Sequence, residues 1–186
     1  MRTFIAVPLP KECQNLLEQM QQSLRACKAE VRWVAITSIH LTLKFLGEVD
    51  PEAIPTLNVR LSEACKSERH FELRLRSLGC FPNSRNPRVL WCGIDGATES
   101  LLRLQHVVEC ACAELGFPPE DRPFHPHLTL GRIQGGRNVQ PLLERIAIGS
   151  DLECSFRADC LHIYKSSLKP QGALYTVLHT IMLKDH

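Results

Sequence analysis

Hydrophobic residues recur along the chain with two periods, that of a β-strand and that of an α-helix. Alternation of apolar and polar positions predicts strands at residues 2–9, 31–34, 40–47, 71–81, 89–94, 127–133, 155–164 and 173–183. Helical spacing predicts helices at residues 10–28, 51–68, 98–115 and 138–148. Strands and helices that alternate in this way predict a mixed fold, α/β or α+β.

One tetrapeptide, His-Leu-Thr-Leu, occurs twice, at residues 40–43 and 127–130. Residues two apart in a strand point to the same face. We therefore expect His40 and Thr42 to share one face of their strand, and His127 and Thr129 to share one face of theirs, with the leucines in the core. A single His-x-Thr arises readily by chance, whereas two identical tetrapeptides do so far more rarely.

The order of the predicted elements is repeated as well. The two motif histidines are 87 residues apart, and the same offset places the opening strand on the strand at 89–94. The order strand, helix, motif strand, helix, strand therefore occurs in residues 1–81 and again in 88–166, and a last strand follows at 173–184. We interpret this as an internal duplication within one two-lobed domain, residues 1–186. The expected architecture is two sheets with outer helices around a central cleft that carries the two motif strands; the strand pairing stays open.

Composition narrows the classes of protein. The chain has 186 residues and 44% hydrophobic content, as a globular domain does. Its net charge of +2 is too balanced for a strongly basic nucleic-acid-binding protein, so an anionic substrate must meet local patches. Nine cysteines without a Cys-x-x-Cys pair favour reduced thiols and a cytoplasmic location over a zinc site. The sequence has neither a secretory signal nor a membrane span, so we expect no membrane partner.

The motif side chains suit proton transfer at a phosphate. An imidazole titrates near pH 6.5, so one histidine can accept a proton while the other donates one. Threonine hydroxyls can hold the non-bridging oxygens of a phosphate. No carboxylate pair stands beside either motif. The sequence therefore predicts phosphoryl chemistry with neither a metal ion nor a cofactor.

The blocks HLTLKFLG and FPPEDRPFHPHLTLGR resemble the two-histidine phosphoesterase superfamily with its paired H-x-T-x (HXTX) motifs. RTFIAVPLP, GCFPNSRNPRVLW and YKSSL extend the resemblance over nearly the whole chain, most closely to the RNA 2',3'-cyclic phosphodiesterases, also called 2'-5' RNA ligases. This resemblance implies a hydrolase of RNA processing that opens a 2',3'-cyclic phosphate at an RNA end to leave a 2'-phosphomonoester. By motif position it makes His40 the acid that protonates the departing 3' oxygen and His127 the base that activates water. Thr42 and Thr129 would hold the phosphate, and reversal on a 2',5' linkage would be ligation.

Five further residues are candidates for substrate binding. Lys44 is two positions after Thr42, so in a regular strand it shares the face of His40 and Thr42. It either points into the cleft or is a solvated lysine. Arg132 has the opposite parity to the second motif and reaches its face only if the strand twists or bulges. Tyr164 and Ser166 resemble a Tyr-x-Ser element near the family's cleft, with packing as the alternative. Phe4 either stacks on a base or belongs to the core.

Two other functions stay open. The cleft could act on a small cyclic nucleotide or nucleotide derivative, or the chain could be a non-catalytic RNA-binding module of the same fold. The other histidines lack a threonine two places on, so we expect surface, packing or loop-shaping roles for them. Because a duplicated cleft supplies its own twofold, we expect a monomer.

Overall fold

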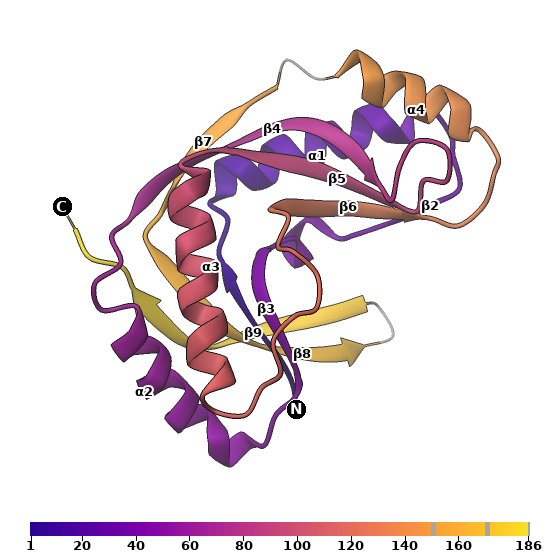
Figure 1. Ribbon diagram of the computed structural model, residues 1–186. Helices are drawn as coiled ribbons and strands as arrows, with labels where there is room; N and C mark the ends of the chain where they lie inside the picture. The colour runs from indigo at the N-terminus through magenta and orange to yellow at the C-terminus, as the bar shows by residue number, and fades with distance from the viewer. Residues whose placement is uncertain (150–151, 170–171, 186) are drawn as a thin grey trace.

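The computed structural model describes residues 1–149, 152–169 and 172–185, and it places the strands of these residues in two antiparallel sheets (Figure 1). Sheet A has the spatial order β3 (Leu41–Glu48), β1 (Arg2–Val7), β8 (Cys160–Lys169) and β9 (Gly172–Met182). Sheet B has the order β2 (Val31–Trp33), β6 (His127–Ile133), β5 (Val89–Gly96), β4 (Phe71–Phe81) and β7 (Cys154–Ala158). The predicted mixed α/β class with two sheets is confirmed.

Helices cover one face of each sheet. The first pair, α1 (Lys11–Arg25) and α4 (Val139–Ile148), contacts β7 and β4 of sheet B. The second pair, α2 (Ile54–Ala64) and α3 (Thr98–Ala113), contacts β9 and β3 of sheet A. Figure 1 shows the first pair in the upper part of the molecule and the second in the lower left part. Each helix packs its apolar stripe on the covered face of a sheet. In the described part of the chain, the other face of each sheet has no helix on it.

Each sheet combines strands from both halves of the chain. Sheet A pairs β1 with β8, and sheet B pairs β5 with β4. The strand predicted at residues 155–164 is wrong as a single element, because the chain leaves sheet B after Ala158 and enters sheet A at Cys160. The helix predicted at 51–68 is shorter: a 3-10 turn, η2 (Pro51–Ala53), precedes α2, which ends at Ala64. No helix in the described ranges has the length and apolar character needed to cross a bilayer.

Both motif strands carry a β-bulge at the same motif position. In the β1–β3 pair, Ile5 lies opposite Lys44 and Ala6 opposite Thr42, so Leu43 is the extra residue. In the β5–β6 pair the corresponding leucine, the last of the second motif, is skipped in the same way. A bulge inserts one residue into one strand and thereby reverses the facing of every residue beyond it.

The bulge makes the prediction for Lys44 wrong. Lys44 lies opposite Ile5 on the helix-covered face, and only 2% of the residue is exposed. Its Nζ donates to Glu109 Oε1 of α3 at 2.6 Å and to the carbonyl oxygen of Pro118 at 2.9 Å. Lys44 therefore connects the first motif strand to α3 and to the segment that leads into the second motif.

Candidate active site

The first motif lies at the helix-free face of sheet A. His40 directly precedes β3 instead of lying within it, and Thr42 is paired with Ala6 of β1. The intervening Leu41 is fully buried in the core on the other face. Alternation along the strand thus directs Thr42 away from the helices.

Three aromatic rings surround His40. The ring centroids of Tyr164, Tyr175 and Phe4 lie 4.6, 5.2 and 5.9 Å from that of the imidazole. Phe4 is 4% exposed and stacks on Tyr164 at 5.0 Å, so its ring is packed within the cluster. Ser166 is paired directly with Tyr175 and so lies on the same face. Tyr164 and Ser166 therefore lie on the face of sheet A toward which the His40 cluster is directed, and Tyr164 is buried within that cluster.

Burial sets the protonation preference of His40. Loss of solvation lowers the pKa of His40 below its ordinary value of 6.5, and His162 adds to this shift. The nearby backbone of Ser38 acts in the opposite direction and raises the pKa of His40. The Nδ1 atom of His40 is buried and has no hydrogen-bond partner among the described residues. Because Nδ1 is enclosed, Nε2 is the nitrogen through which His40 can exchange a proton.

His162 contacts this cluster through Tyr164. Its Nδ1 is 2.9 Å from the hydroxyl oxygen of Tyr164, and its ring is 5.3 Å from the Tyr164 ring. Burial raises the pKa of Tyr164 to about 12, so the phenol keeps its proton at neutral pH. Strand alternation carries a signal for this contact, since His162 and Tyr164 are two residues apart in β8 and so share a face.

The second motif lies at the helix-free face of sheet B. Thr129 is paired with Trp91 of β5, and His127 with Gly93. The Phe81 ring meets the His127 ring edge-on at 5.0 Å and lies 5.3 Å from Trp91. A Cβ at Gly79 would clash with the indole of Trp91, so this position needs glycine to let the ring lie across its strand. Aromatic rings thus flank both motif histidines.

A backbone carbonyl orients His127. Its Nδ1 lies 2.6 Å from the carbonyl oxygen of His125. Since a carbonyl oxygen can only accept, Nδ1 must hold the proton, and the neutral ring presents the lone pair of Nε2. The backbone of His125 therefore fixes the orientation of the His127 ring, with Nε2 as the nitrogen that is not held by this contact.

A short segment joins the two motif strands. Val34, directly after β2, donates its N–H to the carbonyl oxygen of Leu130 in β6, and only five residues lie between Val34 and His40. The buried amide of Gln21 in α1 donates to both carbonyl oxygens, of Val34 at 2.7 Å and of Leu130 at 2.9 Å. Arg25 donates to the Gln21 oxygen. These bonds hold the start of the segment against the second motif strand.

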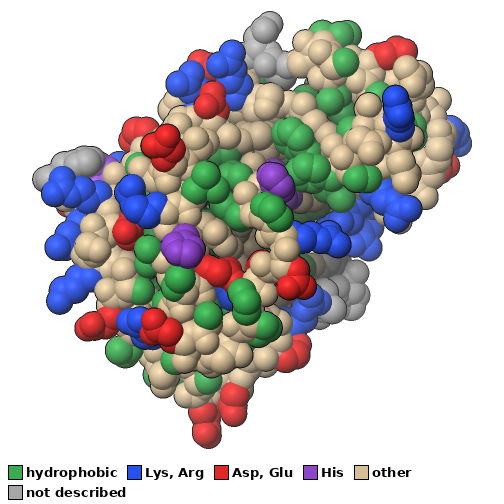
Figure 2. Space-filling view, in the orientation of Figure 1, with side chains coloured by type: hydrophobic (Ala, Val, Ile, Leu, Met, Phe, Trp, Pro, Cys, Tyr) green, Lys and Arg blue, Asp and Glu red, His purple; other side chains and the backbone are tan. Residues whose placement is uncertain are grey.

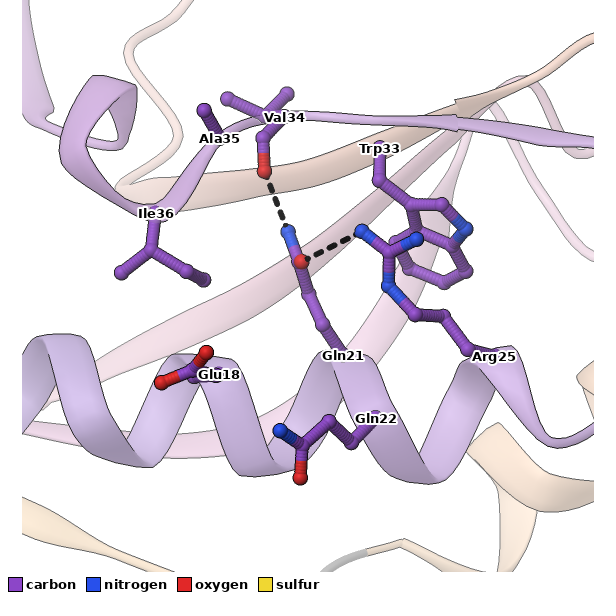
Figure 3. A pocket seen from close by; sticks show the side chains of 8 residues that line it. All are labelled: Glu18, Gln21, Gln22, Arg25, Trp33, Val34, Ala35 and Ile36. Atoms are coloured by element: carbon purple, nitrogen blue, oxygen red, sulfur yellow. Dashed lines mark hydrogen bonds between the residues drawn. The ribbon is translucent and has the colours of Figure 1, made fainter.

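A cavity of about 550 Å³ lies between α1 and this segment (Figure 3). Gln21, Arg25 and Trp33 line it, with the Arg25 guanidinium 4.8 Å from the centroid of the Trp33 ring. Since α1 covers the core side of sheet B, this cavity is on the opposite side of the sheet from His127 and Thr129. On the face of the molecule that Figure 2 shows, hydrophobic side chains gather between its upper and lower parts.

The second bulge decides where Arg132 lies. Beyond Leu130 the facing reverses, and Arg132 is paired with Val89, two residues before Trp91 on β5. Trp91 is the partner of Thr129, so Arg132 shares the face of Thr129. A bulge was one of the two conditions under which Arg132 could reach the motif face, and β6 has that bulge.

Comparison with known proteins identifies the family. A family model described as LigT like Phosphoesterase matches residues 7–91 and 94–175. The chain belongs to the LigT-like phosphoesterases. The match includes both His-x-Thr motifs.

Relatives of similar length share this family. The chain is 32% identical over 183 residues to an RNA 2',3'-cyclic phosphodiesterase of Methanothermobacter thermautotrophicus, and the match covers 98% of each chain. It is 34% identical over 166 residues to an enzyme of the same name from Aeropyrum pernix, covering 89% of this chain and 93% of the relative. These relatives confirm the predicted resemblance.

Solved LigT-like structures have the same fold. A protein of Thermus thermophilus superposes with a TM-score of 0.80 at 30% identity and 98% coverage of both chains. E. coli LigT in complex with 3'-AMP superposes with a TM-score of 0.76 at 28% identity, covering 98% of this chain and 97% of LigT. The arrangement of two sheets with outer helices is therefore that of the family.

Proposed function

We propose that this chain opens 2',3'-cyclic phosphate ends of RNA to 2'-phosphomonoesters by acid–base catalysis without a metal ion, with His40 and His127 as the proton-transfer pair. The observation that carries the proposal is the duplicated His-x-Thr face. Each histidine has one ring nitrogen buried or held by backbone and the other available, and each motif threonine faces away from the helices. The relatives named RNA 2',3'-cyclic phosphodiesterase support this choice of substrate.

The proposed reaction is a displacement at phosphorus. His127 Nε2 takes a proton from water, whose oxygen bonds to phosphorus while the bond from phosphorus to O3' breaks. His40 gives its proton to O3', which leaves as the 3' hydroxyl, and the phosphate stays on O2'. The hydroxyls of Thr42 and Thr129 donate to the non-bridging oxygens, whose charge increases in the transition state. With a 5' hydroxyl in place of water, the same steps would form a 2'-5' linkage.

The low pKa of His40 shapes this mechanism. Burial favours neutral His40 in the free enzyme, whereas the acid role needs the imidazolium. A bound phosphate anion beside the ring would favour the charged form and raise its pKa again. Substrate binding would therefore load the acid with its proton.

We expect kcat/KM to depend on pH as a bell. The base must be free of its proton and His40 must hold the proton that it donates, so activity falls on both sides of an optimum. Because burial lowers the pKa of His40 in the free enzyme, loss of its proton begins at a lower pH than for an ordinary histidine and lowers kcat/KM along the alkaline limb. The limb of kcat should lie higher, because it reports the substrate complex. Initial rates across both limbs test this; an alkaline limb that stays in place in His40→Ala would contradict the role of His40.

The experiment that tests the function is hydrolysis of a short RNA with a 2',3'-cyclic phosphate end, in EDTA, with the product isomer identified. We expect complete conversion to the 2'-phosphate at a rate that EDTA does not change. A 3'-phosphate product would reverse which oxygen leaves and overturn the roles of the two histidines. Loss of activity in EDTA that Mg²⁺ or Mn²⁺ restores would overturn the metal-free mechanism.

A second candidate substrate is a small nucleotide. E. coli LigT has been solved in complex with 3'-AMP and also with ATP, so a similar protein accommodates mononucleotides. Comparing kcat/KM for a 2',3'-cyclic mononucleotide and for an RNA with the same terminal base separates the two. A higher value for the mononucleotide would favour the small substrate.

A further inference from the structure

Two cysteines that are 141 residues apart in the sequence bring their sulfur atoms into contact. Cys13 is in the first turn of α1 and Cys154 is the first residue of β7, and their Sγ atoms are 3.0 Å apart. Both thiols are free. Nonbonded carbon atoms pack at about 3.5–4.0 Å, and a disulfide bond is about 2.05 Å long. The two sulfurs are therefore inside ordinary packing distance and about 1 Å from bonding distance.

The contact lies on the helix-covered side of sheet B. Cys154 is paired with Leu75 of β4, which is fully buried, and Phe156, two residues further along β7, is buried as well. Cys154 therefore points toward α1, which contacts β7. His127 and Thr129 face the opposite side of this sheet, so the proposed mechanism uses neither thiol.

The two sulfurs differ in their access to solvent. Cys13 is fully buried, whereas Cys154 is half-buried. Burial, the contact with Cys154 and the charge of Glu12 raise the pKa of Cys13. A dissolved thiol reagent can therefore reach Cys154 first, and Cys13 then reacts with the sulfur beside it.

We propose that Cys13 and Cys154 form a reversible disulfide when the protein meets a small-molecule disulfide such as oxidised glutathione. The Cys154 thiolate attacks one sulfur of the oxidant, which forms a mixed disulfide and releases one small thiolate. Cys13 gives its proton to solvent and attacks the Cys154 sulfur, which closes the protein disulfide and expels the second small thiolate. Two protein thiols are thus oxidised, and the oxidant is reduced to two small thiols.

The bond would join two of the connections between the sheets. Residues 8–10 lead from β1 of sheet A to α1, and Asp159 leads from β7 of sheet B to β8 of sheet A. Closing so long a loop restricts the unfolded chain and thereby stabilises the folded one. An excess of small thiol, which reaches the half-buried Cys154 sulfur, would reverse the change.

The test incubates the reduced protein with oxidised glutathione, maps its disulfides by mass spectrometry of peptides and measures Tm. We expect one disulfide, between Cys13 and Cys154, and a rise in Tm of about 6–12 °C that dithiothreitol reverses. Cys13→Ala and Cys154→Ala should each abolish the disulfide and the rise. Cys27→Ala is the matched control, because Cys27 is also half-buried and its Sγ contacts the carbonyl oxygen of Pro141; it should keep both.

Cys154→Ala keeps the test decisive if Cys13→Ala fails to fold, because Cys154 is the less buried of the two. Any of three results with the wild type would overturn the proposal: both thiols still free, a glutathione adduct that persists on Cys154, or an unchanged Tm after the disulfide has formed. None of these readouts requires hydrolysis, so they decide the role of the thiols even if the proposed function is wrong.

Discussion

His40→Ala and His127→Ala should each lower kcat for cyclic-phosphate hydrolysis by about 10²–10⁴-fold, the range for loss of a general acid or base. Each variant removes one proton transfer while leaving both threonines in place. Because both transfers serve one displacement, the double variant should be little slower than the slower single variant. Single-turnover rates on a short RNA with a cyclic end measure the chemical step.

The pH dependence of these variants separates catalysis from a structural role. Without His40 the alkaline limb of the profile should change, since His40 must keep the proton that it donates and burial lowers its pKa. His106→Ala is the control, because His106 is an exposed histidine of α3. If either motif variant kept both limbs and lost less than about tenfold in kcat, the two-histidine mechanism would be wrong.

The fold class and the motif faces could be predicted because their signal is periodic. The alternation of His40 and Thr42 with buried leucines needs only the pleat of a strand, and the same holds for His127 and Thr129. The matching bulges at Leu43 and Leu130 could not be predicted, because strand periodicity carries no mark of one inserted residue.

The bulges explain both departures from strand parity. They turn Lys44 to the helix-covered face and Arg132 to the motif face, each against simple alternation. The rings of Tyr175 and Phe81 were missed for a different reason. They come from strands distant in sequence, and sheet pairing that combines both halves of the chain decides which side chains meet. For Trp91 a signal was available, since the 87-residue offset places it on Phe4 of the opening strand.

Lys44→Met should destabilise the protein by about 3 kcal/mol, because it leaves Glu109 without its cation. The Lys44 side chain is 1% exposed and that of Glu109 15%, so water can solvate the remaining carboxylate only in part. Methionine keeps most of the volume of lysine, which limits the loss of packing. For a chain of this length the change corresponds to a fall in Tm of about 6–12 °C. Urea unfolding at neutral pH measures it.

The double variant Lys44→Met/Glu109→Gln should recover most of the lost stability, since removing both charges of a buried pair costs far less than removing one. Glu109 also accepts from the backbone N–H of Glu120, which lies in the segment leading into the second motif. Loosening this segment would disturb His127, so any loss of kcat in the single variant should be recovered together with stability. Direct binding of substrate by Lys44 makes the opposite prediction, because glutamine at position 109 cannot replace a missing cation at a phosphate. Recovery of stability without recovery of kcat/KM would therefore indicate that Lys44 binds the substrate directly.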